Sequence, residues 1–290
     1  MEMFLLATVS GVMTGVIYAL VAVGFVLIYK CSGIFNFAHG ALVLLGAYVC
    51  WTFLYELGLP VWLGILLALI VAAIFGLLIE RLALRPLIGE SILALVMVTI
   101  ALNELIRGGV TTYWGSLDLE FVKIFPAGAV HLDGIVLSRA HLIGAAMAAA
   151  LLAAFVLFFR YSRWGLAMRG VAEGHQVARS MGISVKSIIG LSWAIAAMVA
   201  TLAGVLQGSI SGFQIQMWEI ILIPVAAAII GGLDSIPGAV VASLLIGVLE
   251  KIVSTYVGYG AGVPAAFMIM VVLLFFRPYG FWGLQRIERV

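Results

Sequence analysis

The chain has 290 residues, of which 65% are hydrophobic and only 10% carry a charged side chain. A soluble globular domain has about 25% charged residues, so this composition excludes a protein whose whole surface meets water. The formal net charge of only +2, with no basic cluster interleaved with aromatic side chains, excludes nucleic acid as a partner and leaves membrane lipid as the solvent for much of the surface.

Nine apolar segments lie between the charged positions, and each is a candidate transmembrane helix. A helix that crosses the bilayer needs about 20 mostly apolar residues. The predicted spans are 3–29, 31–55, 57–79, 91–106, 142–159, 187–210, 220–232, 239–249 and 263–276. Residues 220–249 form either two helices or one broken element. The sequence therefore predicts an all-α polytopic membrane protein. It is a single transmembrane domain over residues 1–290 with eight or nine helices, some of them broken or re-entrant.

The basic side chains gather in loops on one side of the predicted spans. Their positions are Lys30, Arg81, Arg85, Arg160, Arg163, Arg169, Arg179, Lys186, Arg277, Arg286 and Arg289. Loops rich in Lys and Arg stay in the cytoplasm, so we expect the C-terminus and a coupling loop at 160–186 to be cytoplasmic and the N-terminus to be outside. Residues 108–140 contain several turn-forming sequences and are expected to form an external loop with a short hairpin.

The sequence contains no residue pattern typical of a catalytic or metal site. Its four histidines, at positions 39, 131, 141 and 175, are scattered, and no phosphate-binding loop of the form G-x-x-x-x-G-K-[ST] is present. We therefore expect the chain to be no enzyme and to need neither a cofactor nor a metal.

Residues 32–40 place polar side chains inside or at the mouth of the second predicted span. Backbone can leave a helix at membrane depth only where protein or a water-filled cavity satisfies its polar groups. Asn36 and His39 therefore either bridge neighbouring helices or line a substrate path together with Phe37, since polar groups within a membrane are costly and often functional. Asn103, near the predicted end of the fourth span, is a further neutral candidate for that path.

A second break in the apolar pattern occurs at residues 231–240, where a polar turn with several glycines is followed by Gly238-Ala239 and a new apolar segment. It resembles the break before Gly40-Ala41. Paired Gly/Pro interruptions in the two halves of a chain indicate transporter repeats. The alternative is that these glycines only permit tight helix packing.

The third informative segment is 164–183, a partly amphipathic stretch ended by Gly182, a residue typical of helix C-caps. Apolar residues at helical spacing within the most basic loop indicate a short helix that docks into another protein. The alternative is a helix that rests on the membrane surface. The candidate docking residues are Arg169, Glu173, Val177, Ala178, Met181 and Gly182.

These three segments, in this order and spacing, resemble the LivH-type permeases, the branched-chain amino acid branch of the ABC importers. The matching stretches are Gly33-x-x-Asn36-Phe37-Ala38-His39-Gly40, Trp164–Gly170 with Met181-Gly182-Ile183, Gly231–Ala239 and the tail Arg277–Gly283. The docking segment departs from the "EAA" loop of other importers, because Gln176-Val177-Ala178 stands where Glu-Ala-Ala is expected.

The resemblance implies a pore subunit of an ATP-driven importer in a bacterial inner membrane, moving branched-chain or other hydrophobic amino acids by alternating access. It also implies its partners: a LivM-type second permease subunit, two ATP-binding subunits on the cytoplasmic face, and a soluble substrate-binding protein outside. ATP would be hydrolysed by the partner subunits.

Two alternatives remain open at this point. Relatives with similar motifs carry urea, short amides or aromatic acids. A stand-alone secondary transporter is the other alternative, and it would place a coupling carboxylate or a polar cluster at mid-membrane. The candidate carboxylates, Glu104 and Asp234, both lie near predicted span ends, which favours the importer.

Overall fold

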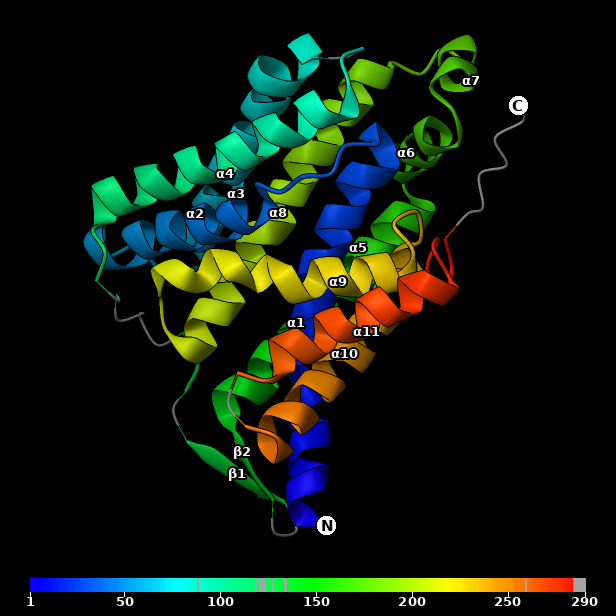
Figure 1. Ribbon diagram of the computed structural model, residues 1–290. Coiled ribbons are helices and arrows are strands. Elements are labelled where there is room, and N and C mark those ends of the chain that lie inside the picture. The colour runs from blue at the N-terminus through cyan, green and yellow to red at the C-terminus, as the bar shows by residue number, and fades with distance from the viewer. Residues whose placement is uncertain are drawn as a thin grey trace.

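The computed structural model describes residues 1–87, 89–117, 119, 124–126, 128–132, 135–258 and 260–283. Within them the chain is a bundle of helices with one small β hairpin (Figure 1). The α-helices are α1 (Glu2–Ser32), α2 (His39–Trp51), α3 (Val61–Leu78), α4 (Ile92–Trp114), α5 (Arg139–Tyr161), α6 (Arg163–Glu173), α7 (His175–Ser180), α8 (Val185–Ser211), α9 (Leu222–Gly231), α10 (Ile236–Tyr256) and α11 (Gly262–Phe276). Short π or 3₁₀ segments, η1 (Thr52–Glu56), η2 (Ile79–Leu84), η3 (Arg85–Leu87) and η4 (Ile215–Ile221), extend α2, α3 and the start of α9.

Six helical stretches among the described residues are long and apolar enough to cross a membrane. They are α1, α3 with its continuation to Leu87, α4, α5, α8 and α10, while η4 with α9 (Ile215–Gly231) and α11 are shorter apolar helices. The all-α polytopic class is therefore confirmed. The ambiguous residues 220–249 form two helices, α9 and α10, separated by a turn at Gly232, whose φ is +102°.

Several predicted span boundaries are wrong, and two of them change the place of nearby polar residues. The second span does not begin at residue 31, because the chain leaves the helix after Ser32 and α2 begins only at His39. The fourth span does not end at 106, because α4 continues to Trp114. Within this last part of α4, the hydroxyls of Thr111 and Thr112 donate to the carbonyls four residues earlier. The first residues of the expected 108–140 loop are thus part of a helix.

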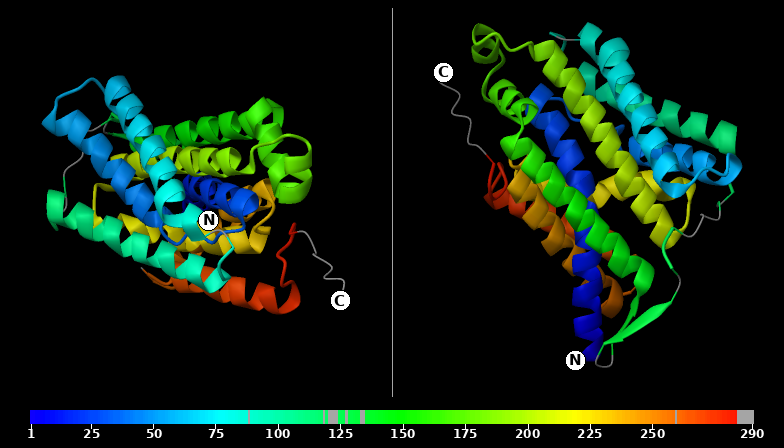
Figure 2. Two further views of the ribbon diagram at one scale, coloured as in Figure 1. Left: turned by 90° about the horizontal axis from the view of Figure 1, so that it is seen from above. Right: turned by 180° about the vertical axis from the view of Figure 1, so that it is seen from behind.

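α1 lies at the centre of the bundle and is almost wholly buried over its second half (Figure 2). Its small residues permit close contact with α10: a Cβ at Gly15 would lie 2.9 Å from the Cα of Leu244. Small residues at such crossings allow membrane helices to approach closely. α8 packs on another side of α1, and the main core is formed by α1, α2 and α8.

The predicted hairpin is confirmed. Strands β1 (Ala129–Leu132) and β2 (Ile135–Ser138) pair antiparallel, with Ala129 opposite Ser138. The hairpin lies beside the N-terminus at one end of the molecule, and α6 and α7 lie at the opposite end (Figure 1). The basic positions Arg286 and Arg289 lie outside the described residues.

Candidate functional site

Residues 33–39 form an ordered connection between α1 and α2. Gly33 ends α1 with a φ of +71°, and its N–H bonds the Tyr29 carbonyl at 2.7 Å. Asn36 then turns the chain: its Oδ1 accepts a hydrogen bond from the Ala38 N–H at 3.1 Å, and its carbonyl accepts one from the His39 N–H. Such local side-chain bonds replace missing helix bonds where one helix stops and the next begins.

The structure places the four predicted path residues in different surroundings. Asn36 and His39 are fully buried, Asn103 is 7% exposed, and Phe37 is 44% exposed. The His39 ring packs against α1 so closely that a Cβ at Gly24 would lie 2.9 Å from its Nε2. This geometry favours the interpretation in which Asn36 and His39 join neighbouring helices, and their place on a substrate path stays a prediction.

A polar group at the middle of α4 is the feature that the sequence reading missed. Arg107 Nη1 donates to both carboxylate oxygens of Glu104, at 2.9 and 3.1 Å, and the Asn103 amide donates to Glu104 Oε1 at 3.2 Å. The Arg107 guanidinium lies over the Trp218 ring of η4, with 4.1 Å from Cζ to the ring centroid. Glu104 therefore does not lie near a span end, because α4 extends ten residues beyond it to Trp114.

Residues 33–40, the first glycine-bearing break in the sequence, contact η4 beside this polar group. Gly40, in the first turn of α2, lies directly against the Trp218 backbone, where a Cβ would overlap the Trp218 carbonyl. α4 contacts the same region, because the Thr99 hydroxyl lies within hydrogen-bond distance of both the Val96 carbonyl, at 2.8 Å, and the Phe35 carbonyl, at 3.1 Å. Residues 33–40 thus help to position the polar group of α4 and η4. The sequence signal for that group was an acid and a base three residues apart, a spacing that brings them together on one face of a helix.

The other motifs meet at the end of the molecule opposite the hairpin. Lys30 Nζ donates to the Asp234 carbonyl at 2.7 Å, and His175 Nε2 donates to the Cys31 carbonyl at 3.1 Å. The C-terminal residues 277–283 contact the same end of the molecule, because the Phe281 N–H donates to the carbonyl of Ile230 at 2.9 Å. A hollow of about 690 Å³ lies between the end of α1 and residues 171–177.

The docking segment is two helices, α6 and α7, separated at Gly174, instead of one amphipathic stretch. Val177 and Met181 are 66% and 76% exposed, and Glu173 is also exposed. Gly182 has a φ of +78° and ends the segment as predicted.

Two of the predicted docking residues contact the subunit itself. Ala178 is only 2% exposed, because α7 packs its small side chain against the core. Arg169 Nη1 bonds the carbonyls of Phe159 and Arg160, at 2.6 and 2.9 Å, and so compensates the negative end of α5. Ala178 is therefore covered by the subunit itself, whereas Arg169 stays partly exposed, and a contact of either residue with a partner stays a prediction.

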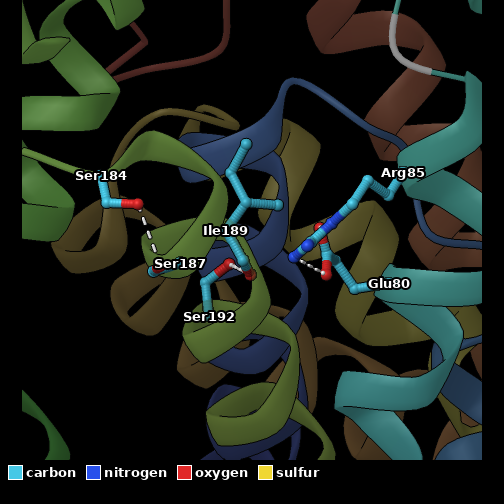
Figure 3. Close-up of polar contacts among 6 residues, drawn as sticks. All are labelled: Glu80, Arg85, Ser184, Ser187, Ile189 and Ser192. Atoms are coloured by element: carbon cyan, nitrogen blue, oxygen red, sulfur yellow. Dashed lines mark hydrogen bonds and ion pairs between the residues drawn. The ribbon is translucent and has the colours of Figure 1, made fainter.

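An ion pair with a buried carboxylate and a partly exposed guanidinium, Glu80 with Arg85, lies near this end of the molecule (Figure 3). Arg85 Nε and Nη2 donate to the two carboxylate oxygens of Glu80 at 3.1 and 2.8 Å, and the Glu80 side chain is 2% exposed. The carboxylate faces α8, where a Cβ at Gly190 would lie 3.3 Å from Oε2. The predicted third span ends at residue 79, but η2 and η3 continue α3, and Glu80 in η2 faces inward.

The comparisons with known proteins agree along nearly the whole chain. The family model described as branched-chain amino acid transport system / permease component matches residues 7–277. The chain is 31% identical over 306 residues to the high-affinity branched-chain amino acid transport system permease protein LivH of Escherichia coli (strain K12), covering 99% of this chain and 98% of LivH. Its identity to BraD of Pseudomonas aeruginosa is also 31%, over 301 residues and the same shares of each chain.

A solved structure has a similar fold. PsaBC from Streptococcus pneumoniae in complex with Fab matches with a TM-score of 0.50 and 17% identity, over 93% of this chain and 91% of that one. The family match covers far more than half of the chain, and the two relatives are aligned almost from end to end. This chain therefore belongs to the family of permease components of branched-chain amino acid transport systems.

Proposed function

We propose that the chain is one half of the translocation pore of an ATP-driven importer of branched-chain or other hydrophobic amino acids. Its partners are a second permease subunit of the LivM type, two ATP-binding subunits and a soluble substrate-binding protein. The chain itself binds no nucleotide and contributes two alternative helix packings, which expose the cargo in turn to each side of a bacterial inner membrane.

The observation that carries the proposal is the exposed apolar surface of α7. Val177 in α7 and Met181 directly after it are largely exposed. The basic residues Arg179 and Lys186 lie close to them in the sequence. Burial of apolar area stabilises a contact by about 25 cal/mol per Å², so these two side chains gain most when a partner supplies a groove. A cytoplasmic ATP-binding subunit is the partner that a permease component requires at this point.

The basic loops at the same end of the molecule indicate how the chain is oriented in the membrane. The basic loops lie with α6 and α7, and Lys/Arg-rich loops remain in the cytoplasm. We propose that this end is cytoplasmic and that the N-terminus and the hairpin are outside. A cysteine introduced at Ser162 and one introduced at Ser116 should react with an impermeant thiol reagent from opposite faces of the membrane. Labelling of both from one face would contradict the orientation.

Reconstitution tests the function directly. The chain is produced with its second permease subunit and both ATP-binding subunits, placed in liposomes and supplied with the substrate-binding protein. We expect ATP-dependent uptake of leucine, and ATPase activity stimulated by leucine-loaded receptor but not by receptor with urea or benzoate. Uptake by the chain alone, without ATP or partners, would favour the secondary transporter instead.

A further inference from the structure

Glu104 and Arg107 lie near the middle of α4, an apolar helix long enough to cross the membrane, on the outside of the bundle. Glu104 is about 18 Å from the start of α4 and about 15 Å from its end, at about 1.5 Å per residue. α4 is an outer helix of the bundle (Figures 1 and 2), and the side chains of Glu104 and Arg107 are 63% and 29% exposed. Charged groups facing lipid at this depth are costly, so they normally face protein or a water-filled cavity. This face of α4 therefore does not face lipid in the assembled transporter.

The guanidinium of Arg107 is only partly used by the chain. Both of its hydrogen bonds to Glu104 come from Nη1, and its buried Nε has no acceptor among the described residues. Trp218 holds the plane of the group from one side. The other terminal nitrogen, Nη2, is not among the buried atoms, so a carboxylate could accept a charge-assisted hydrogen bond from it.

Glu104 carries the opposite charge to Arg107 and can accept a further hydrogen bond. An ionised carboxylate offers about four lone-pair sites, and three hydrogen bonds from Arg107 and Asn103 reach the two oxygens. The buried Asn103, whose own Oδ1 has no partner among the described residues, fixes the carboxylate in place. An ammonium group beside the exposed oxygen would be stabilised by the same charge.

The surface beside the pair has room and an apolar wall. Gly108 lies one turn after Glu104 on the same face of α4, and a Cβ there would meet nothing within 4 Å. On the other side, Ile100 and Met97 lie one and two turns before Glu104 on that face and are 42% and 57% exposed. This face of α4 therefore combines a cation, an anion, an uncovered glycine and exposed apolar side chains.

We propose that Glu104, Arg107 and Trp218 form a transient cargo site for the α-amino acid zwitterion, with the cargo carboxylate on Arg107, its ammonium on Glu104 and its apolar side chain along Ile100 and Met97. The proposal rests on the proposed function and deepens it, because it names the chemistry that the path recognises. It favours zwitterionic amino acids over urea, which has no charges to pair, and over aromatic acids, which lack the ammonium.

The test measures leucine uptake per ATP hydrolysed in liposomes that contain the complete transporter and leucine-loaded receptor. Arg107→Gln and Glu104→Gln should each lower this ratio at least tenfold. Gly108→Leu, which covers the surface beside Glu104 without removing a charge, should lower it comparably. Gly109→Leu is the matched control, since Gly109 is equally open but points away from Glu104, and it should stay within twofold of the unaltered protein. The exchanged pair E104R/R107E keeps an ion pair but reverses its direction, and should not recover uptake.

The outcomes separate the two proposals. Absence of ATP-dependent leucine uptake in the unaltered transporter would overturn the proposed function. With that uptake present, recovery in the exchanged pair, or uptake within twofold in Arg107→Gln and Gly108→Leu, would overturn the cargo site. Loss of the assembled complex in both Arg107→Gln and Glu104→Gln would also overturn it, since the pair would then be a contact between subunits.

Discussion

Lys30 and Asp234, 204 positions apart in the sequence, are joined by a hydrogen bond of 2.7 Å from the lysine Nζ to the aspartate carbonyl. The bond connects the last turn of α1 to the turn between α9 and α10. Ser235 in the same turn caps α10 by accepting from the Gly238 N–H at 3.1 Å. The two glycine-bearing breaks in the sequence thus meet through the basic residue that precedes the first of them.

Replacement of Lys30 by Met should loosen the turn at 232–235. A hydrogen bond to a charged donor contributes about 1.5–3 kcal/mol when well formed, and Lys30 is half-buried, so we expect a loss of about 1–2 kcal/mol and a lower Tm of the purified subunit. Lys186→Met, which removes an exposed lysine from α8, is the control and should leave the Tm unchanged. Equal Tm values for the two variants would contradict a structural role for the Lys30 bond.

The Glu80–Arg85 pair predicts a different pattern of stability. Replacing Arg85 by Met leaves a carboxylate that is 2% exposed without its bidentate partner, and breaking a buried pair in this way costs about 3–5 kcal/mol. The double variant E80M/R85M should recover most of that loss, because it removes both charges together. Thermal unfolding of the three proteins measures the difference.

Lys251 supplies the matched control for this pair. Its Nζ is 3.8 Å from Glu250 and its side chain is 35% exposed, so Lys251→Met should cost less than about 1 kcal/mol. A double variant that is as unstable as Arg85→Met would show that packing around η2, and not the charge pair, determines stability at this position.

The crossing of α1 and α10 depends on the absence of side chains. Gly15→Val should separate the two helices, because even a Cβ at this position lies 2.9 Å from the backbone of Leu244 and Ser243. We expect poor accumulation in the membrane and a Tm lower by several degrees. Gly109→Ala on α4, where a Cβ meets nothing within 4 Å, should be neutral or slightly stabilising, since alanine favours helix over glycine by about 0.5–1 kcal/mol. An equally stable Gly15→Val protein would contradict the close crossing.

Most of the fold could be predicted because lipid imposes a simple pattern on the sequence. Runs of about 20 apolar residues between charges are detectable by composition alone, and they gave the helical class and the approximate positions of the spans. The helix boundaries were harder to predict where local hydrogen bonds determine them. Nothing in the composition of 31–38 shows that Asn36 turns the chain, and Thr111 and Thr112 look like loop residues until their hydroxyls bond the preceding turn.

The candidate site was harder to predict because its residues come from elements far apart in the sequence. The sequence shows that Glu104 and Arg107 are three residues apart, but only the full length of α4 places them at the middle of a helix. Trp218 joins them through the tertiary contact of η4 with α2, where Gly40 makes room for its backbone. Burial also decides which faces of α6 and α7 are available, and the amphipathic pattern alone did not identify Ala178 as an inward residue.

The burial of Ala178 changes which substitution tests docking of an ATP-binding subunit. Ala178→Asp would place a carboxylate where the side chain is 2% exposed, and an unpaired buried charge costs several kcal/mol. We therefore expect this variant to lower the yield and the Tm of the folded subunit itself. Its effect on ATPase activity would then report misfolding and not the loss of a contact.

Met181→Asp is the sharper test, because Met181 is 76% exposed and its replacement leaves the subunit intact. Burial of a methionine side chain in a partner's groove is worth about 1.5–3 kcal/mol, so its loss, with a charge added, should weaken co-purification of the ATP-binding subunits at least tenfold at an unchanged Tm. Gln176→Asp adds the same charge at another exposed position of α7 but removes no apolar side chain, and it should retain most of the association. Should Met181→Asp bind the ATP-binding subunits as well as Gln176→Asp does, α7 is not the docking surface, and residues 81–90, beside the Glu80–Arg85 pair, become the next segment to alter.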